Sequence, residues 1–449
     1  MAIEVQGQGK RSTHRVLFFP ILLLGMVLPL PLKAEKSEQP PERPHEGQPI
    51  PPKILVRSFT FTGNSVVSDA ELATITQPYL NQELSLADLE RVADLLTEVY
   101  RNKGYTLAKA YVIAQKPADE TVQIQILEGR LSEITVTGNQ YYSTEFIRRG
   151  FTPLFIDPVI KHRSLERSLL LLNENLDLKV TTTLAPGETT GTTKVLAQVE
   201  DKRPLHVALD VNNFGFVNIS RYRFGGTVDI GNLLFQGSVL TLNGIIGDNP
   251  DQLSYESGTY SVPLNGWGTR LILSGSNSKF AVGGALTVLN INAKVKSYDV
   301  SLTHPVIKST FQNLLAEVGF ASKDNPLFAL EQLTFDDHLR MLKAGVNYDR
   351  TDNWGRSFLS LYGYQGLGKF LGGMADNDPL ASHVGADNRF QKADLSLGRI
   401  HSLGHDFFLL LRGTGQISAG PLPIIEQVLL GGPDTVRGYQ LGERFVDEA

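Results

Sequence analysis

From residue 205 to about residue 420, apolar and polar residues alternate along the chain with a period of two. Val207, Leu209 and Val211 fall on one face of such a segment, while His206 and Asp210 fall on the other. Each alternating segment is roughly ten residues long, and helical periodicity is missing here. The polar face carries charges on most segments, which suits a water-filled lumen. The pattern therefore predicts antiparallel transmembrane strands.

Eleven candidate strands precede a glycine-rich loop near residue 431. They begin near residues 205, 221, 238, 254, 268, 294, 311, 336, 354, 388 and 405. A short turn at 305–309 contrasts with a long loop at 372–388, which we expect on the extracellular side. A soluble all-β sandwich or propeller would also alternate. The unequal connections and the N-terminal leader described below favour a membrane barrel.

The region before residue 205 contains an internal repeat. Residues 59–64 read Phe-Thr-Phe-Thr-Gly-Asn and residues 134–139 read Ile-Thr-Val-Thr-Gly-Asn, at a constant offset of 75. Each copy predicts a strand that ends in a Gly-Asn turn, followed by a short helix, a longer amphipathic helix and two strands. Ser68 begins the first short helix with a capping box. Two unrelated α+β domains would not explain the constant offset.

The N-terminal segment resembles a secretory leader. Basic residues near position 10 precede an apolar run at 16–32, and Ala34 follows at a plausible cleavage point. Three prolines interrupt the run, which argues against a membrane-spanning helix. We expect residues 1–34 to be a signal peptide and the proline-rich residues 35–53 to be an extended linker.

Composition and motifs exclude several classes of function. The chain has 42 Lys plus Arg against 47 Asp plus Glu, so it lacks the basic balance of a nucleic-acid-binding protein. It has no cysteine and therefore no disulfide or thiolate metal site. No nucleophile elbow or phosphate-binding loop is present. His401 and His405 flank a predicted hairpin turn. Two solvent-exposed imidazoles on a turn are a better interpretation of this pair than a metal site. We expect no enzyme activity, cofactor or metal, and a barrel hydrolase is the least favoured alternative.

The loop after the last predicted strand contains the tetrapeptide Val436, Arg437, Gly438 and Tyr439. By itself it could be a surface loop with an exposed arginine. However, Leu422-Pro423, Glu426-Gln427 and Gly431-Gly432 precede it. Together these residues resemble the signature loop of two-partner secretion transporters, which are outer-membrane barrels preceded by POTRA domains. The resemblance covers nearly the whole chain after the leader.

This resemblance implies a fold class of α+β POTRA repeats followed by an all-β transmembrane antiparallel barrel. It places one POTRA domain at 54–129, a second at 130–204, and the N-terminal part of the barrel at 205–449. Barrels of this family have about sixteen strands, with the signature loop after the eleventh. The chain therefore carries about eleven of them, and we expect the sequence to be a fragment or a truncated product.

The same resemblance implies a function. The chain is similar to transporters of the Gram-negative outer membrane whose periplasmic POTRA domains capture an unfolded, exported partner protein and pass it through the barrel. The expected partners are a large exoprotein of haemolysin or adhesin type and outer-membrane lipid, with no nucleic acid. An assembly factor that inserts barrels into the membrane is the alternative, although such factors usually carry more than two POTRA domains.

Two candidate sites follow from the resemblance. Arg437 is expected to enter the lumen and pair with an acidic residue on a later strand, as a lock for the signature loop. The strand at 107–115 is expected at the edge of the first POTRA sheet, where an extended chain could add by main-chain hydrogen bonds. Its candidate partner-binding residues are Leu107, Tyr111, Val112 and Ile113. The sequence does not reveal which of the N–H groups of Val112 and Ile113 points outward.

Overall fold

The computed structural model describes residues 53–115, 120–157, 159–216, 218–405, 407–431, 439 and 444–448. The expected signal peptide and almost all of the linker lie outside this part of the chain. The described residues form two compact units. One comprises residues 53–100 and 109–127, and the other comprises residues 101–108 and everything from residue 128 onward.

The first repeat unit packs two helices on a small sheet. Its elements are β1 (Ile54–Val56), β2 (Ser58–Thr62), α1 (Asp69–Thr76), η1 (Gln77–Tyr79), β3 (Gln82–Leu84), α2 (Leu86–Asn102), β4 (Lys109–Val112) and β5 (Thr121–Leu127). Strand β5 lies between β2, which is parallel to it, and β4, which is antiparallel. The Ser68 side chain caps α1 by accepting from the Glu71 N–H, as predicted. Leu89, Val92 and Leu96 form the buried face of α2, also as predicted.

The second repeat unit has the same plan. Its elements are β6 (Arg130–Thr137), α3 (Thr144–Gly150), α4 (Thr152–Ile156), α5 (His162–Leu172), β7 (Leu178–Pro186) and β8 (Thr192–Asp201). The sheet order is β6-β8-β7, again with one parallel and one antiparallel pair. The buried core of this unit includes Ile134, Phe146, Leu172 and Val195. The repeated order of strands and helices confirms the prediction of two related units.

The Gly-Asn turn of each repeat has a steric cause. Gly63 and Gly138 have φ angles of +84° and +90°. A Cβ atom built on Gly63 would lie 2.2 Å from the Ile126 carbonyl oxygen, and one built on Gly138 would lie 2.4 Å from that of Val199. Only glycine fits this left-handed turn without moving the neighbouring strand. The sequence match at both positions therefore reflects one shared backbone requirement.

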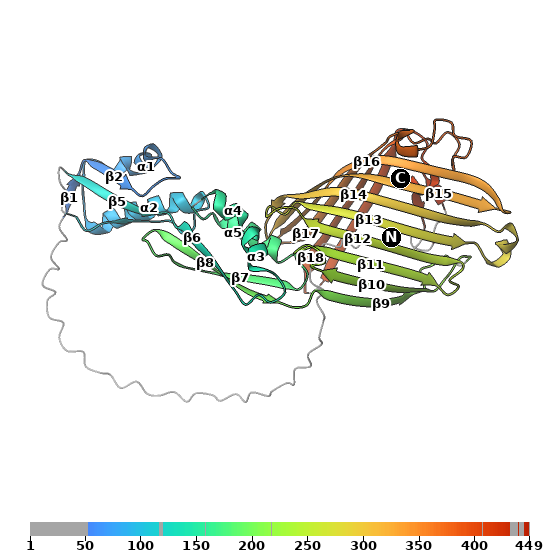
Figure 1. Ribbon diagram of the computed structural model, residues 1–449. Helices are drawn as coiled ribbons and strands as arrows, with labels where there is room; N and C mark the ends of the chain where they lie inside the picture. The colour runs from blue at the N-terminus through green and yellow to red at the C-terminus, as the bar shows by residue number, and fades with distance from the viewer. Residues whose placement is uncertain are drawn as a thin grey trace, which may run out of the picture. The chain divides into compact units, whose positions relative to one another are not determined.

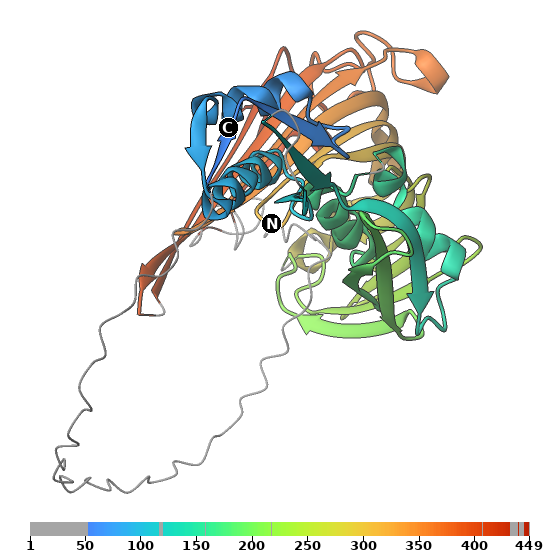
Figure 2. The ribbon, with the colours of Figure 1, turned by 90° about the vertical axis from the view of Figure 1, so that its left-hand side faces the viewer.

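Beyond residue 204 the chain forms an eleven-stranded antiparallel sheet in which each strand pairs with the next along the chain. Its strands are β9 (Leu205–Asn212), β10 (Arg223–Gly231), β11 (Val239–Gly247), β12 (Leu253–Pro263), β13 (Arg270–Ala281), β14 (Asn292–Lys308), β15 (Gln312–Ala329), β16 (Gln332–Asp352), β17 (Gly355–Gly366), β18 (Gln391–Gly404) and β19 (Phe407–Ser418). The sheet curves into an open wall (Figures 1 and 2), and within the described residues β9 and β19 pair on one side only. The predicted number of strands is confirmed.

The two faces of this wall differ in chemistry. One face exposes large apolar side chains from neighbouring strands, among them Val207, Leu209, Phe224, Leu273, Val300, Val318, Leu342, Leu361 and Leu395. On the opposite face, the Lys343 ammonium lies 2.7 Å from Asp299 and 2.8 Å from Glu317. An apolar outer face and a polar inner face are what a lipid-embedded strand requires. No helix among the described residues has the length and apolar character to cross a membrane.

Candidate functional site

The candidate partner-binding strand is shorter than the sequence predicted. Strand β4 begins at Lys109 and ends at Val112, and it occupies one edge of its sheet. Tyr111 is exposed, whereas Val112 and Ile113 are half-buried. Leu107 lies two residues before the strand and packs against the core of the second repeat unit. The structure therefore places Tyr111 and Val112 on the edge strand and Ile113 just after it, but turns Leu107 away from it.

The hydrogen bonds around β4 show which of its N–H groups face outward. The buried Ala110 N–H donates to Thr97 Oγ1 on α2 at 3.0 Å, so it does not point toward β5. Because successive N–H groups of a strand alternate in direction, the Val112 N–H points outward and that of Tyr111 points toward β5. Within β4, Val112 therefore presents the outward donor that α2 does not occupy.

The side chain of Gln115 supports this assignment. Its amide donates to the Gln123 carbonyl oxygen at 2.8 Å and accepts from the Gln123 N–H at 2.9 Å. Gln123 therefore directs both backbone groups toward the β4 side of β5. The same alternation puts Gln125 and its partner Tyr111 in a hydrogen-bonded pair, which again leaves Val112 facing outward.

The segment before the signature loop is anchored to the inner face of the wall. Glu426 lies in η4 (Ile424–Glu426) and is 3% exposed. Its carboxylate lies 2.6 Å from Lys323 Nζ on β15 and 2.8 Å from Lys392 Nζ on β18. Burial opposes ionisation of Glu426, but the two ammonium groups outweigh burial and lower its pKa. The carboxylate is thus held charged between two strands of the wall.

Apolar side chains complete this anchor. Leu422 packs with Leu339 and Met341 of β16, with Met374 of the long loop and with Phe390 just before β18. In addition, the Ile424 N–H donates to Ser382 Oγ at 2.8 Å, and the Ser382 N–H donates to Asp337 at 2.9 Å. The predicted extracellular loop therefore packs against the segment that leads into the signature loop.

The signature tetrapeptide itself is mostly outside the described residues. Val436, Arg437 and Gly438 are not described, and Tyr439 is 59% exposed. On either side of the loop, β20 (Val428–Leu430) pairs with β21 (Arg444–Val446) as a short antiparallel hairpin. Gln427 donates to Asp447 at 2.9 Å and ties the two ends together. The base of the loop is fixed, and the predicted role of Arg437 stays a prediction.

The sequence motif alone predicts no separate role for Glu426. Its position offered a signal, because it is the single charged residue in the mostly apolar run 421–432. A lone carboxylate among buried neighbours needs a cationic partner. The partners themselves were not predictable, since Lys323 precedes Glu426 by 103 residues.

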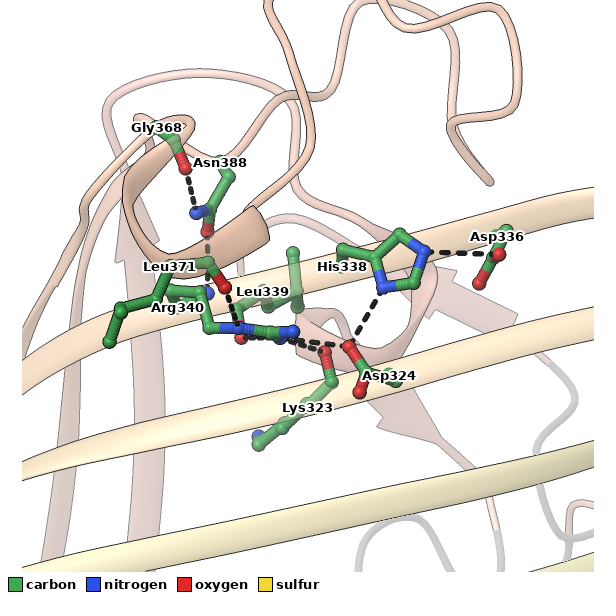
Figure 3. A network of polar contacts seen from close by, with 9 residues as sticks. All are labelled: Lys323, Asp324, Asp336, His338, Leu339, Arg340, Gly368, Leu371 and Asn388. Atoms are coloured by element: carbon green, nitrogen blue, oxygen red, sulfur yellow. Dashed lines mark hydrogen bonds and ion pairs between the residues drawn. The ribbon is translucent and has the colours of Figure 1, made fainter.

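A second polar network lies on β15 and β16, close to the turn that connects these two strands (Figure 3). Asp324 accepts from Arg340 Nη1 at 2.8 Å and lies 2.8 Å from His338 Nδ1, while His338 Nε2 lies 3.1 Å from Asp336. Asn388 accepts from the Arg340 N–H at 3.1 Å. These contacts join the extended β15–β16 hairpin to the loop that follows β17. They also use the carboxylates of Asp324 and Asp336 in internal ion pairs.

Comparison with known proteins identifies the relatives of this architecture. Residues 54–129 match the family described as POTRA domain, ShlB-type. Residues 191–447 match the family described as haemolysin secretion/activation protein ShlB/FhaC/HecB. Both parts of the chain therefore point to the same class of outer-membrane transporter.

Individual relatives agree with this result. The heme/hemopexin transporter protein HuxB of Haemophilus influenzae (strain 86-028NP) is 26% identical over 403 residues, which cover 88% of this chain and 70% of the relative. The outer membrane transporter CdiB of Dickeya dadantii (strain 3937) is 23% identical over 424 residues, which cover 93% and 72%. The structure of CdiB from Escherichia coli has a TM-score of 0.75 at 19% identity and covers 89% of this chain and 74% of that one, which shows a common fold.

Proposed function

The chain belongs to the haemolysin secretion/activation protein family, and we propose that its first POTRA domain captures the secreted partner along the edge of β4. It is an outer-membrane transporter of the two-partner secretion type, with a POTRA domain matched at residues 54–129. A transporter of this type implies a partner protein that is exported unfolded. Transport, rather than catalysis, is the activity that we assign to the chain.

One observation supports the capture step most directly. The outward N–H of Val112 lies on a sheet edge next to the exposed ring of Tyr111. An extended chain that adds to this edge would gain main-chain hydrogen bonds and would bind with little dependence on its side chains. Such recognition suits a partner that arrives before it has folded.

We further propose the nature of the partner and of the path. The partner would be a large exoprotein of haemolysin or adhesin type. Residues 1–34 would direct export, residues 35–53 would link the leader to the first POTRA domain, and residues 130–204 would form the second POTRA domain. Arg437 would then lock the signature loop in the lumen, because a guanidinium can form paired bonds to a carboxylate that lysine cannot reproduce.

The test compares two substitutions at one edge position. Val112→Pro removes the outward donor but spares the ladder to β5, whereas Val112→Ala keeps the donor and trims the side chain. Secretion of the partner exoprotein should fall about tenfold in Val112→Pro, in line with the loss of a hydrogen bond or two. It should stay near the wild-type level in Val112→Ala.

Two measurements distinguish loss of partner binding from unfolding of the domain. The thermal unfolding midpoint of the first POTRA domain should be the same in both Val112 variants, which separates loss of binding from loss of fold. Tyr111→Pro should instead lower that midpoint, because the alternation directs the Tyr111 N–H toward β5. Wild-type secretion by a folded Val112→Pro chain would contradict capture at this edge.

A further inference from the structure

Three lysines form an exposed basic surface on the outer face of the barrel wall. Lys279 lies on β13, and Lys294 and Lys296 lie on β14; all three are exposed. Lys279 and Lys294 are direct cross-strand partners, and Lys296 faces Asn277 in the next row. Like charges directly opposite each other destabilise a sheet. An anionic ligand would remove this repulsion.

Of the acidic groups nearest to these lysines, two have other partners and the third lies two strands away. Lys296 is the register partner of Asp324, but Asp324 is held by Arg340 and His338 (Figure 3). Asp336 is paired with His338. Glu256 lies opposite Asn277, on the second strand from Lys296, at about 10 Å for two inter-strand spacings. Within the described residues, no ion pair neutralises Lys279, Lys294 or Lys296.

The basic surface begins where the apolar band ends. Along β14, the outward positions below Lys296 are Tyr298, Val300 and Leu302, which are 57%, 48% and 43% exposed. An aromatic ring above aliphatic side chains is the arrangement that transmembrane strands adopt at the boundary between hydrocarbon and headgroups. Lys296 and Lys294 follow at two-residue steps, each of roughly 7 Å along the strand. The three ammonium groups therefore lie at headgroup depth.

The direction of the strands decides which leaflet this is. The turn between β12 and β13 contacts the second repeat unit, because Arg167 Nη2 donates to the Trp267 carbonyl oxygen at 2.9 Å. That turn is therefore at the periplasmic end of the wall. Strand β13 then runs away from it toward Lys279. The lysines lie at the cell-surface end, beside the leaflet that is built from phosphorylated glycolipid.

We propose that Lys279, Lys294 and Lys296 bind the phosphate groups of the outer-leaflet glycolipid and thereby fix the β13–β14 part of the wall in that leaflet. The occupant is a bisphosphorylated lipid A-type headgroup. Its two phosphates match a surface with three ammonium groups, while its acyl chains lie on Val300 and Leu302. Tyr298 lies between the two layers. This assignment rests on the outer-membrane location and is independent of the proposed capture by β4.

The test measures lipid retention by the purified full chain with native mass spectrometry. The probes are bisphosphorylated hexa-acyl lipid A, the same lipid after enzymatic removal of both phosphates, and phosphatidylglycerol. The combined variant Lys279→Ser, Lys294→Ser and Lys296→Ser should retain bisphosphorylated lipid A at least about tenfold less than the parent, since each lysine near a charged surface contributes about fivefold. Retention of the dephosphorylated lipid should not change.

Two further variants make the result decisive. The three-fold Lys→Arg variant should retain the bisphosphorylated lipid at least as well as the parent, because guanidinium groups also bind phosphate. A control that removes three exposed cations of the second repeat unit, Arg148→Ser, Arg163→Ser and Lys202→Ser, should match the parent. Equal retention by the parent and the three-serine variant would overturn the proposal. The proposal would also be overturned if the parent retained phosphatidylglycerol or the dephosphorylated lipid as well as it retains bisphosphorylated lipid A.

Discussion

The two repeat units have the same fold but cover their edge strands with different side chains. In the first unit, α2 occupies the Ala110 N–H through Thr97 and leaves the outward Val112 N–H of β4 available. In the second unit, the edge strand is β7, and Asn173 bonds both the N–H and the carbonyl oxygen of Val180 at 2.6 and 3.0 Å. Val180 pairs with Val199 as Ala110 pairs with Ile126, so the two covered positions are equivalent. The units differ in the side chain that covers this position, which is a threonine within α2 in the first unit and an asparagine after α5 in the second.

The second unit also contacts the barrel. Arg167 of α5 donates to the carbonyl oxygens of Trp267 and Pro305, which lie in two different connections of the wall. Glu166 accepts from the N–H and the hydroxyl of Thr310 at 2.9 and 2.6 Å. These contacts use the helix to dock the unit on the wall. Under the proposed capture at β4, the duplicated fold would supply one domain for binding and one for attachment.

The largest effect on stability is expected at the turn glycine that the two units share. Gly63→Ala and Gly138→Ala should each destabilise their own unit by about 2–4 kcal/mol, since each introduces a left-handed alanine whose Cβ meets a carbonyl oxygen. Thermal unfolding followed by hydrogen exchange would report each unit separately. Loss of stability in one unit only would show that the repeated turn is not an equivalent constraint.

The docking contacts come next in expected size. Arg167→Ala leaves two carbonyl oxygens without their charged donor and should weaken docking by about 2–3 kcal/mol. Amide exchange at residues 264–269 should become faster, while the first unit should be unaffected. Arg163→Ala, an exposed position on the same helix, is the matched control. Unchanged exchange in the Arg167 variant would mean that apolar packing, and not this arginine, holds the unit.

The sequence allowed the two repeat units and the eleven strands to be predicted, because both depend on short periodicities. A period of two identifies strands, and the spacing of Leu89, Val92 and Leu96 identifies the face of α2. The expectation that Leu107 belongs to the edge strand was wrong, because tertiary packing draws it into the core of the second unit. Helix α4 and the short pair β1–β3 lack any clear periodic signal.

The candidate site was harder to predict for a physical reason. The alternation that singles out Val112 depends on a bond between Thr97 and Ala110, which lie on different elements. The anchor of Glu426 likewise needs Lys323 and Lys392 from separate strands. Such pairs are fixed by the fold as a whole. A local pattern can nominate one member of the pair, but it cannot name the other.

The smallest expected effect comes from removing the side chains that cover the edge strands β4 and β7. Thr97→Val leaves the buried Ala110 N–H without an acceptor, and Asn173→Ala exposes the N–H and carbonyl oxygen of Val180. Each should cost its unit about 1–3 kcal/mol, because a buried polar group loses its partner. The stability effects should therefore be similar.

Partner binding should distinguish these variants. Asn173→Ala opens backbone groups on β7, so photo-crosslinks from an exported partner should appear at β7 as well as at β4. Thr97→Val should leave crosslinking at β4 close to the wild-type level, because the Val112 donor is untouched. Crosslinks confined to β4 in the Asn173 variant would show that docking on the barrel, and not the asparagine, keeps the second edge closed to the partner.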